Sequence, residues 1–315
     1  MLPSLARRFV LSAPLTMTTF NDYFTGPPRD LLERAVDLAL DEDGQDLTAK
    51  AVFQRGDRLT ASIKAKEDTL VAGLPIADVV LERLGIISVT GREYHATDGD
   101  RITAGTVAAV FTGPAVGLLK AERVILNFLC HLSGIANLTA RYAQALSGSR
   151  TRLLDTRKTL PGLRHPEKYA VLMGGGLNHR RNLAEMLMLK DNHIDRAGGV
   201  TQAIEAVRRA HAKGSPPLEV ECRTLDEVRQ AVALAPERIM LDNMTLEQMR
   251  EALALIPQGI ETELSGGVSL ETLPELGKLG ADFISVGRIT HSAPYADFSM
   301  QIGLATPSRP AGNSA

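Results

Sequence analysis

At 315 residues the chain is longer than one average domain and shorter than three, so one large or two modest domains are expected. The composition, 44% hydrophobic and 23% charged without tryptophan, is typical of a globular protein, and no apolar run has the roughly 18 residues that a membrane-spanning helix needs. A net charge of −2 argues against general nucleic-acid binding, which usually requires a basic domain.

The first half of the chain predicts a mixture of helices and strands. Apolar residues at helical spacing predict a helix over residues 30–40, and Asp46 follows as a turn or cap. Alternating or β-branched runs predict strands over residues 58–63 and 105–112. Residues 118–132 are long, apolar and free of helix breakers, and therefore predict a buried helix.

The second half has a repeating rhythm. Short apolar runs end in Glu221, Asp242, Glu263 and Ser285, at intervals of 21, 21 and 22 residues, with helical stretches between them. Each interval accommodates one strand, one helix and two short loops, which indicates parallel strands. Tandem units of this size favour a β/α barrel, either complete or in an incomplete seven-stranded form, behind an N-terminal α+β sandwich-like domain.

These patterns predict the domain limits. We expect an extension over residues 1–17, an α+β domain over 18–130, a catalytic barrel over 131–290 and a disordered tail over 306–315, with residues 291–305 packing back on the first domain. Residues 1–16 could also be a weak targeting segment, although Arg7, Arg8 and Pro14 interrupt its apolar stretch. Cys130 and Cys222 lack the spacing of a zinc site or disulfide framework, which suits a cytoplasmic location.

Charge is concentrated in one segment. Between Arg150 and His193 there are nine Lys or Arg residues and four acids, so this segment carries an excess of five positive charges and the remaining chain carries −7. A basic segment in an acidic protein suggests a focused site for a small anion. Strand ends build the active site of a β/α barrel, and polar residues lie at the predicted strand ends: Asp155, Lys190, Glu221, Asp242 and Ser265.

Three segments in this region carry a recognisable pattern: DTRKTLPGLR (155–164), GGGLNHR (174–180) and MLKDNH (188–193). Together with ERVILNFLCHLSG (122–134), LDN (241–243), SGG (265–267) and ISVG (284–287), they closely resemble the quinolinate phosphoribosyltransferases. The resemblance extends from about residue 30 to residue 299. It implies a pentosyltransferase that joins quinolinate to 5-phosphoribosyl 1-diphosphate and releases diphosphate and carbon dioxide, giving nicotinate mononucleotide for NAD biosynthesis.

The resemblance also implies a quinolinate pocket. Quinolinate carries two adjacent carboxylates, and arginine binds a carboxylate through two parallel hydrogen bonds. By resemblance the pocket is lined by Arg123, Thr156, Arg157, His179, Arg180 and Lys190. The family forms dimers with shared sites, so Arg123 is expected from the neighbouring subunit; read alone, it would be a surface ion-pair residue. The resemblance leaves open whether the dimers assemble further.

The donor and its magnesium ion require anion-binding and oxygen-donating groups. By resemblance, the donor site comprises Lys158, Glu221, Asp242, Ser265, Gly266, Gly267, Val286 and Gly287. Glu221 and Asp242 would hold Mg²⁺ directly or through water, because this ion prefers oxygen ligands and keeps several waters. The catalytic set implied is Lys158, Lys190, Glu221 and Asp242. Two residues depart from the family pattern, Leu264 and Arg288, where alanine is common.

Three alternatives compete with this interpretation. One is a Schiff-base lyase on a β/α barrel, with Lys190 or Lys158 as nucleophile. Another is the molybdenum-transport-associated relative of the phosphoribosyltransferases, against which residues 190–193 favour the quinolinate enzymes. The third is a phosphate-ligand sensor without turnover, against which Lys158, Glu221 and Asp242 argue. Neither a membrane nor a nucleic acid is an expected partner.

Overall fold

The structure is a computed structural model that describes residues 18–86, 91–211 and 215–304. The expected extension over residues 1–17 and the expected tail over residues 306–315 therefore lie outside the described residues. The chain divides into two compact units. Among the described residues, the sheet unit comprises Thr19–Leu138, Leu160–Gly174 and Ala293–Leu304, and the barrel unit comprises Thr139–Thr159 and Gly175–Ser292.

The helices of the sheet unit include the one expected near residue 30. They are α1 (Phe20–Tyr23), α2 (Pro27–Asp43), α3 (Leu47–Val52), α4 (Ile76–Arg83), α6 (Arg164–Met173) and the greater part of α5 (Ala115–Ala145). Asp46 caps α3 by accepting a hydrogen bond from the Ala49 backbone N–H, which confirms its expected role. The apolar residues Leu32, Val36 and Leu40 of α2 lie one helical turn apart and are buried, so the helix packs through one stripe.

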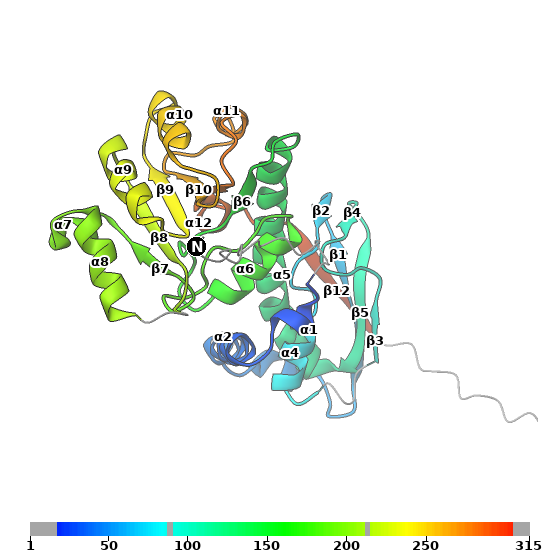
Figure 1. Ribbon diagram of the computed structural model, residues 1–315. Coiled ribbons are helices and arrows are strands. Elements are labelled where there is room, and N and C mark those ends of the chain that lie inside the picture. The colour runs from blue at the N-terminus through cyan, green and yellow to red at the C-terminus, as the bar shows by residue number, and fades with distance from the viewer. Residues whose placement is uncertain (1–17, 87–90, 212–214, 305–315) are drawn as a thin grey trace, which may run out of the picture. The chain divides into compact units, whose positions relative to one another are not determined.

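An antiparallel sheet of four strands forms the body of this unit (Figure 1). Its order is β12 (Phe298–Leu304), β1 (Arg58–Ala65), β5 (Val107–Pro114) and β3 (Gly91–Tyr94). A small pair, β2 (Thr69–Leu70) and β4 (Arg101–Ile102), is separate. Alternate residues of β1 are buried, among them Ala61 and Ile63, so one face of the sheet supplies the core. The strands expected over residues 58–63 and 105–112 are therefore confirmed.

Helix α5 is longer than the sequence predicts. The expected helix ends at Leu132, whereas α5 continues through Ser133 and Gly134 to Ala145. A side chain at position 134 would lie 3.0 Å from the Pro294 carbonyl carbon and 3.2 Å from the Ala296 nitrogen. Glycine at this point therefore allows another backbone to approach the helix and does not end it.

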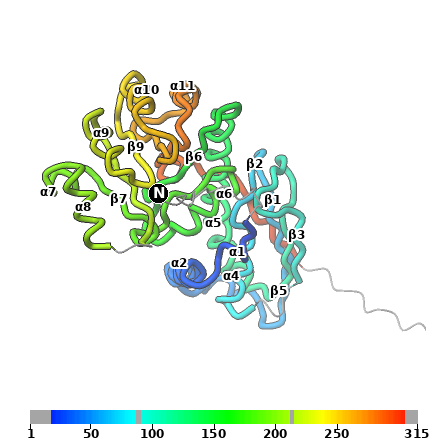
Figure 2. Tube along the Cα trace, viewed as in Figure 1, coloured from blue at the N-terminus to red at the C-terminus, as the bar shows by residue number. Residues whose placement is uncertain are grey.

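The barrel unit consists of alternating strands and helices. Its strands are β6 (Arg152–Leu154), β7 (Leu187–Leu189), β8 (Leu218–Cys222), β9 (Arg238–Asp242), β10 (Glu261–Ser265) and β11 (Phe283–Ser285). Its helices are α7 (Asp191–Ala197), α8 (Val200–Ala210), α9 (Leu225–Leu234), α10 (Leu246–Leu255), α11 (Leu273–Lys278) and α12 (Arg288–His291). Helices α8, α9 and α10 lie outside the strands, and the trace alternates between inner strand and outer helix (Figures 1 and 2).

The strands pair in parallel in the order β6-β11-β10-β9-β8-β7. A parallel bridge between Leu154 and Leu177 adds a seventh position beside β6. Among the described residues no ladder joins the Leu177 segment to β7, so the sheet has the character of an incomplete seven-stranded barrel. Every residue of β8 and β11 is buried, as expected for parallel strands covered on both faces. No helix in the described ranges combines the length and apolarity needed to cross a membrane.

Candidate active site

The polar residues expected at strand ends lie along one edge of the barrel sheet. Glu221 is the fourth residue of β8, and Asp242 and Ser265 end β9 and β10 in direct register with each other. Asp155 and Lys190 directly follow β6 and β7. Because parallel strands place their carboxyl ends at the same edge, the structure gathers these five side chains where barrel enzymes bind their ligands.

Two carboxylates at this edge are placed differently. Glu221 is mostly buried, and its Oε2 accepts a hydrogen bond of 3.1 Å from Lys190 Nζ. Asp242 is half-buried, and its Oδ2 accepts a hydrogen bond of 2.7 Å from Asn243 Nδ2. Oxygen ligands of this kind suit Mg²⁺, so the donor set fits the expected metal.

Asp155 fixes the backbone around the expected pocket. This carboxylate is fully buried and accepts hydrogen bonds from the His179 N–H and from Asn178 Nδ2, both 2.8 Å long. It directly precedes the Thr156–Lys158 loop, in which the Thr156 hydroxyl accepts the Lys158 N–H. One buried acid therefore connects the two segments that carry the expected cations.

The cations Arg157 and Arg180 lie within electrostatic range of each other, and Arg180 Nη1 donates to the Met186 carbonyl oxygen at 2.8 Å. Burial, and then the charge of Arg157, lower the pKa of Arg180 below its ordinary value. The Nε atom of Arg157 is buried and has no hydrogen-bond partner among the residues that the structure describes. Two guanidinium groups within electrostatic range, one with an unused buried donor, form a site that an anion would complete.

A turn at the end of β10 requires glycine. Gly266 has a φ of +91°, and a side chain there would lie 2.8 Å from the Asn243 nitrogen. Gly267 has a φ of +63° with open space around it. A cavity of about 450 Å³ adjoins this turn, lined in part by Asn243, Met244, Met249, Gly266 and Gly267. Exposed backbone beside a cavity suits a phosphate group.

Gly287, after β11, brings three further side chains together. A side chain at this position would meet Lys158 Cδ at 2.8 Å, and Thr156 Oγ1 and His291 Cδ2 at 3.3 Å. The Thr290 hydroxyl also donates to the Lys158 carbonyl oxygen. His291 was absent from the residues expected from sequence. The signal that could have found it is its spacing of four residues after Gly287, one turn into α12.

The remaining expected residues lie as follows. Val286 is buried, and its N–H donates to the Leu154 carbonyl oxygen, so its role is in the sheet. Arg123 is exposed on α5, in the sheet unit. Leu264 is fully buried in β10, whereas Arg288 is exposed and its charge lowers the pKa of Glu271 after that group's hydrogen bonds.

Beneath the strand ends lies a group of buried charges that the motifs did not reveal: His179, Glu219, Arg238 and Glu263. His179 Nε2 lies 3.0 Å from Glu219 Oε2 and 3.6 Å from Glu263 Oε2. Arg238 Nη1 donates to Glu263 Oε2 at 3.1 Å. Both glutamates lie two residues before a strand-end residue, Glu221 or Ser265, and therefore share its face of the sheet. That spacing is the sequence signal for them.

Burial dominates the electrostatics of this buried charge group. Loss of solvent raises the pKa of Glu219 and of Glu263 to about 7; the charge of Glu219 further raises the pKa of Glu263, whereas Glu263 lowers that of Glu219. Burial alone would lower the pKa of Arg238, but the charges of Glu219 and Glu263 more than offset this effect, and the pKa is raised. The barrel interior thus contains several ionisable groups, although both oxygens of Glu219 and Oε1 of Glu263 are buried without a hydrogen-bond partner among the described residues.

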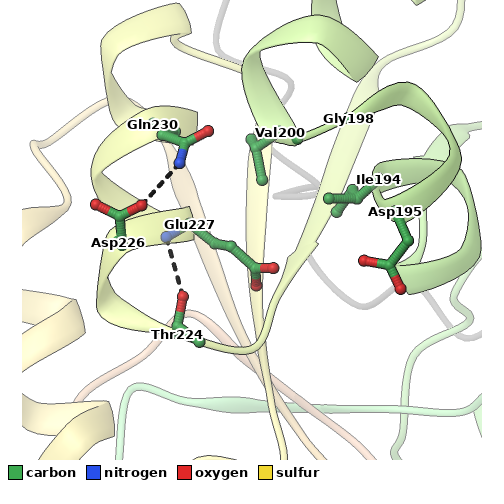
Figure 3. Close-up of a pocket in the computed structure, with 9 residues that line it drawn as sticks. Ile194, Asp195, Gly198, Val200, Thr224, Asp226, Glu227 and Gln230 are labelled. Atoms are coloured by element: carbon green, nitrogen blue, oxygen red, sulfur yellow. Dashed lines mark hydrogen bonds between the residues drawn. The ribbon is translucent and has the colours of Figure 1, made fainter.

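A second cavity, of about 490 Å³, lies between α7, α8 and α9 (Figure 3). Asp195, Asp226 and Glu227 give it an acidic lining. Arg223 pairs with Asp195 and Glu227 at 2.7 and 2.8 Å, so these carboxylates already have a cationic partner. None of the residues expected to bind substrate lines this cavity.

Comparisons with known proteins identify the fold and the chemistry together. The family model "Quinolinate phosphoribosyl transferase, C-terminal domain" matches residues 135–301, and the corresponding N-terminal domain model matches residues 46–133. A nicotinate-nucleotide pyrophosphorylase [carboxylating] of Mycobacterium leprae is 38% identical over 282 residues, which cover 87% of this chain and 96% of that protein.

Two further relatives extend the comparison. A chloroplastic nicotinate-nucleotide pyrophosphorylase [carboxylating] of Arabidopsis thaliana is 40% identical over 291 residues, covering 86% of this chain and 82% of that protein. Among solved structures, NadC from Streptococcus pyogenes is 39% identical and superposes with a TM-score of 0.83, covering 90% of this chain and all of that one.

Proposed function

The chain belongs to the quinolinate phosphoribosyltransferase family, and from this premise we propose how its own residues carry out the reaction. The reaction transfers phosphoribose from 5-phosphoribosyl 1-diphosphate to quinolinate and releases carbon dioxide and diphosphate, which gives nicotinate mononucleotide in NAD biosynthesis. Family membership disfavours the molybdenum-transport relative, the Schiff-base lyase and the non-catalytic sensor.

The pair Arg157 and Arg180 carries the assignment of the acceptor site. Arg157 Nε is buried and unused among the described residues, and burial and then repulsion from Arg157 lower the pKa of Arg180. A dianion between the two guanidinium groups would relieve that repulsion and supply the missing acceptor. Thr156, His179 and Lys190 complete the pocket in this chain, and Arg123 enters from the second subunit of a homodimer.

The donor lies at the neighbouring strand ends. Its 5-phosphate binds the backbone of Ser265, Gly266 and Gly267, with Val286 and Gly287 on the next strand. Lys158 contacts the diphosphate, and the position of His291 beside Gly287 and Lys158 adds this residue to the same site. Glu221 and Asp242 contact the ribose and hold Mg²⁺, which supplies positive charge for the departing diphosphate.

The catalytic residues act by position and charge. As diphosphate leaves, positive charge develops on ribose C1, and Lys158 stabilises the negative charge that grows on the leaving group. The cationic pocket holds the quinolinate ring nitrogen in line with C1. After the nitrogen is alkylated, the positive ring stabilises the carbanion left when the C2 carboxylate departs as carbon dioxide. The mechanism requires no covalent enzyme intermediate.

One assay tests this proposal. Purified protein, 5-phosphoribosyl 1-diphosphate and Mg²⁺ are combined with quinolinate or with nicotinate, and carbon dioxide and nicotinate mononucleotide are followed. We expect product from quinolinate only, and loss of turnover when EDTA removes the metal. Product from nicotinate in place of quinolinate would refute the acceptor assignment, and undiminished turnover in EDTA would refute the metal assignment.

The shared site has its own experiment. Arg123→Ala and Lys190→Ala dimers are each expected to be nearly inactive. Mixing them with subunit exchange assembles some sites with both residues intact, so partial activity should return. Exchange without any recovery would show that Arg123 serves the site of its own chain.

We also propose a cytoplasmic location for the enzyme.

A further inference from the structure

The two nitrogen atoms of the His179 ring have different surroundings: a backbone hydrogen bond at one, and nearby carboxylates at the other. Its Nδ1 accepts a hydrogen bond of 2.7 Å from the Arg180 backbone N–H. Its Nε2 faces two buried carboxylates, Glu219 Oε2 at 3.0 Å and Glu263 Oε2 at 3.6 Å. The ring is buried, and the backbone N–H of His179 donates a hydrogen bond to Asp155 Oδ1.

This geometry determines where the ring proton lies. A nitrogen that accepts a hydrogen bond carries no proton, so Nδ1 is unprotonated and the proton of the ring lies on Nε2. The protonated Nε2 then points toward the two acids, which is the favourable orientation. A second proton, on Nδ1, would remove the bond to Arg180. The ring is therefore neutral as long as that bond is formed.

The same proton argues against a metal ion at this place. One ligand atom each from His179, Glu219 and Glu263 lie within 4.8 Å of one another, close enough to surround an ion. Metal-binding imidazole, however, needs a free electron pair on the ligating nitrogen, and Nε2 uses its pair for the proton. Arg238 also donates to Glu263 Oε2, the oxygen that faces the ring.

Burying the charged side chains beneath the His179 ring costs folding free energy. Barrel interiors are usually filled by branched aliphatic side chains. Here Glu219 and Glu263 are fully buried, and Arg238 is 3% exposed and lies 4.3 Å from the centre of the Phe283 ring. Removing charges from water costs free energy unless each is paired, so a group of this kind suggests a function above it.

We propose that Glu219 and Glu263 are positioning residues of the quinolinate pocket, which hold His179 as the neutral tautomer with its proton on Nε2. In this form Nδ1 fixes the backbone of Arg180, and the guanidinium of Arg180 is aimed beside Arg157. His179 then contributes no charge to quinolinate binding, and Arg157, Arg180 and Lys190 supply the positive charge in this chain. The inference rests on the proposed acceptor site for its consequence, but not for the position of the proton.

The position of the proton can be measured without substrate. Two-bond ¹H–¹⁵N correlation spectra of the intact protein distinguish the Nε2–H tautomer, the Nδ1–H tautomer and the doubly protonated ring. Comparison with His179→Gln assigns the signals of residue 179. We expect the Nε2–H pattern at neutral pH. A proton on Nδ1, alone or together with Nε2, overturns the inference.

The function of the acids is tested by Glu219→Met, which keeps the length of the side chain and removes the carboxylate beside the ring. The KM for quinolinate should rise about tenfold, because the ion-pair contact that holds the ring is lost, with the KM for the donor nearly unchanged. The His179 spectrum should change to a mixture of tautomers. The matched control is Glu261→Gln, because Glu261 binds Arg238 at 2.8 Å on β10 and makes no contact of its own with His179 among the described ion pairs.

Two replacements of the ring separate its two functions. His179→Asn keeps an acceptor at the place of Nδ1, whereas His179→Gln keeps a polar group at the place of Nε2. If the bond to Arg180 is the useful one, the asparagine variant retains more quinolinate affinity than the glutamine variant. The reverse order, or an unchanged KM in a folded Glu219→Met protein, overturns the inference. A wild-type protein without turnover on quinolinate would instead refute the proposed function.

Discussion

In the sheet unit, alternate residues of β1 place apolar side chains such as Ala61 and Ile63 in the core. In the barrel unit, three neighbouring strands that are buried along most of their length place Glu219, Arg238 and Glu263 inside. The first core is stabilised by area removed from water. The second contains ionisable groups that must compensate one another. The barrel core thus gives up stability for the position of charges beneath the strand ends.

The largest expected difference between the cores concerns Arg238. Arg238→Met leaves Glu219 and Glu263 buried without their cation, and we expect a loss of about 3–5 kcal/mol in the free energy of unfolding. Ile63→Val in the other core should cost about 1 kcal/mol. Urea unfolding measures both. Adding Glu219→Gln and Glu263→Gln to Arg238→Met should recover most of the loss; no recovery would show that the charges are not coupled.

A glycine with a left-handed backbone in each unit allows the effect of an alanine substitution to be compared between the two units. Gly266→Ala forces a left-handed conformation on alanine and a 2.8 Å approach to the Asn243 nitrogen, so the KM for the donor should rise at least about tenfold. Gly73 has a similar φ of +87°, but a side chain there meets the Leu132 side chain in the sheet unit. Gly73→Ala should lower the unfolding midpoint and leave the KM unchanged. Equal KM values for the two variants would contradict the phosphate site.

Polar pairs also lie inside the sheet unit, among them His131 with Glu167 and Tyr169 with Asp98. The Tyr169 hydroxyl donates to Asp98 Oδ2 at 2.8 Å, and burial raises the pKa of Asp98. Tyr169→Phe should destabilise the protein by about 1 kcal/mol, because Asp98 keeps its hydrogen bond from the Leu74 N–H. Chemical unfolding measures the change. A loss as large as that of Arg238→Met would mean that both cores depend equally on polar groups.

The smallest expected effect is on how steeply the free energy of unfolding changes with pH. Burial raises the pKa of Glu263 from 4.5 to about 7, so between these values the folded protein holds a proton that the unfolded chain releases. Stability should therefore decrease as pH rises through this window. Glu263→Gln removes one of the two raised carboxyl groups and should reduce that slope by about half. Unfolding midpoints across the window test this, with Ile63→Val, which removes no ionisable group, as the variant that keeps the slope.

Elements with regular periodicity could be predicted from the sequence. The regular interval between strand ends such as Glu221 and Asp242 predicted the barrel. It could do so because the lengths of strands, helices and loops are set locally in the sequence. Ligand-binding segments around Arg157 and Lys190 followed from motifs, and their roles remain predictions. The predicted end of helix α5 at Leu132 was wrong, because the helix continues through Gly134. Glycine is needed there for the approach of the Pro294 backbone, a tertiary contact that the local sequence does not reveal.

The buried charge group was missed for a related reason. Glu219 and Glu263 in short strands resemble ordinary polar residues until the partner strands are known, since their burial depends on Arg238 and His179 from elsewhere in the chain. Leu264 shows the opposite case. It departs from the family pattern beside the phosphate turn, but it is fully buried in β10, so its size belongs to the packing of the strand.

The path of the chain through the two units affects which segments can be exchanged between related proteins. Between Thr19 and Leu304 the chain passes from one unit to the other after Leu138, Thr159, Gly174 and Ser292. The first passage lies inside α5, so a gene cut near residue 134 would divide a continuous helix. Exchange of the family's two sequence domains would cut α5, so we expect recombination between relatives to succeed only where whole interleaved segments are inherited together.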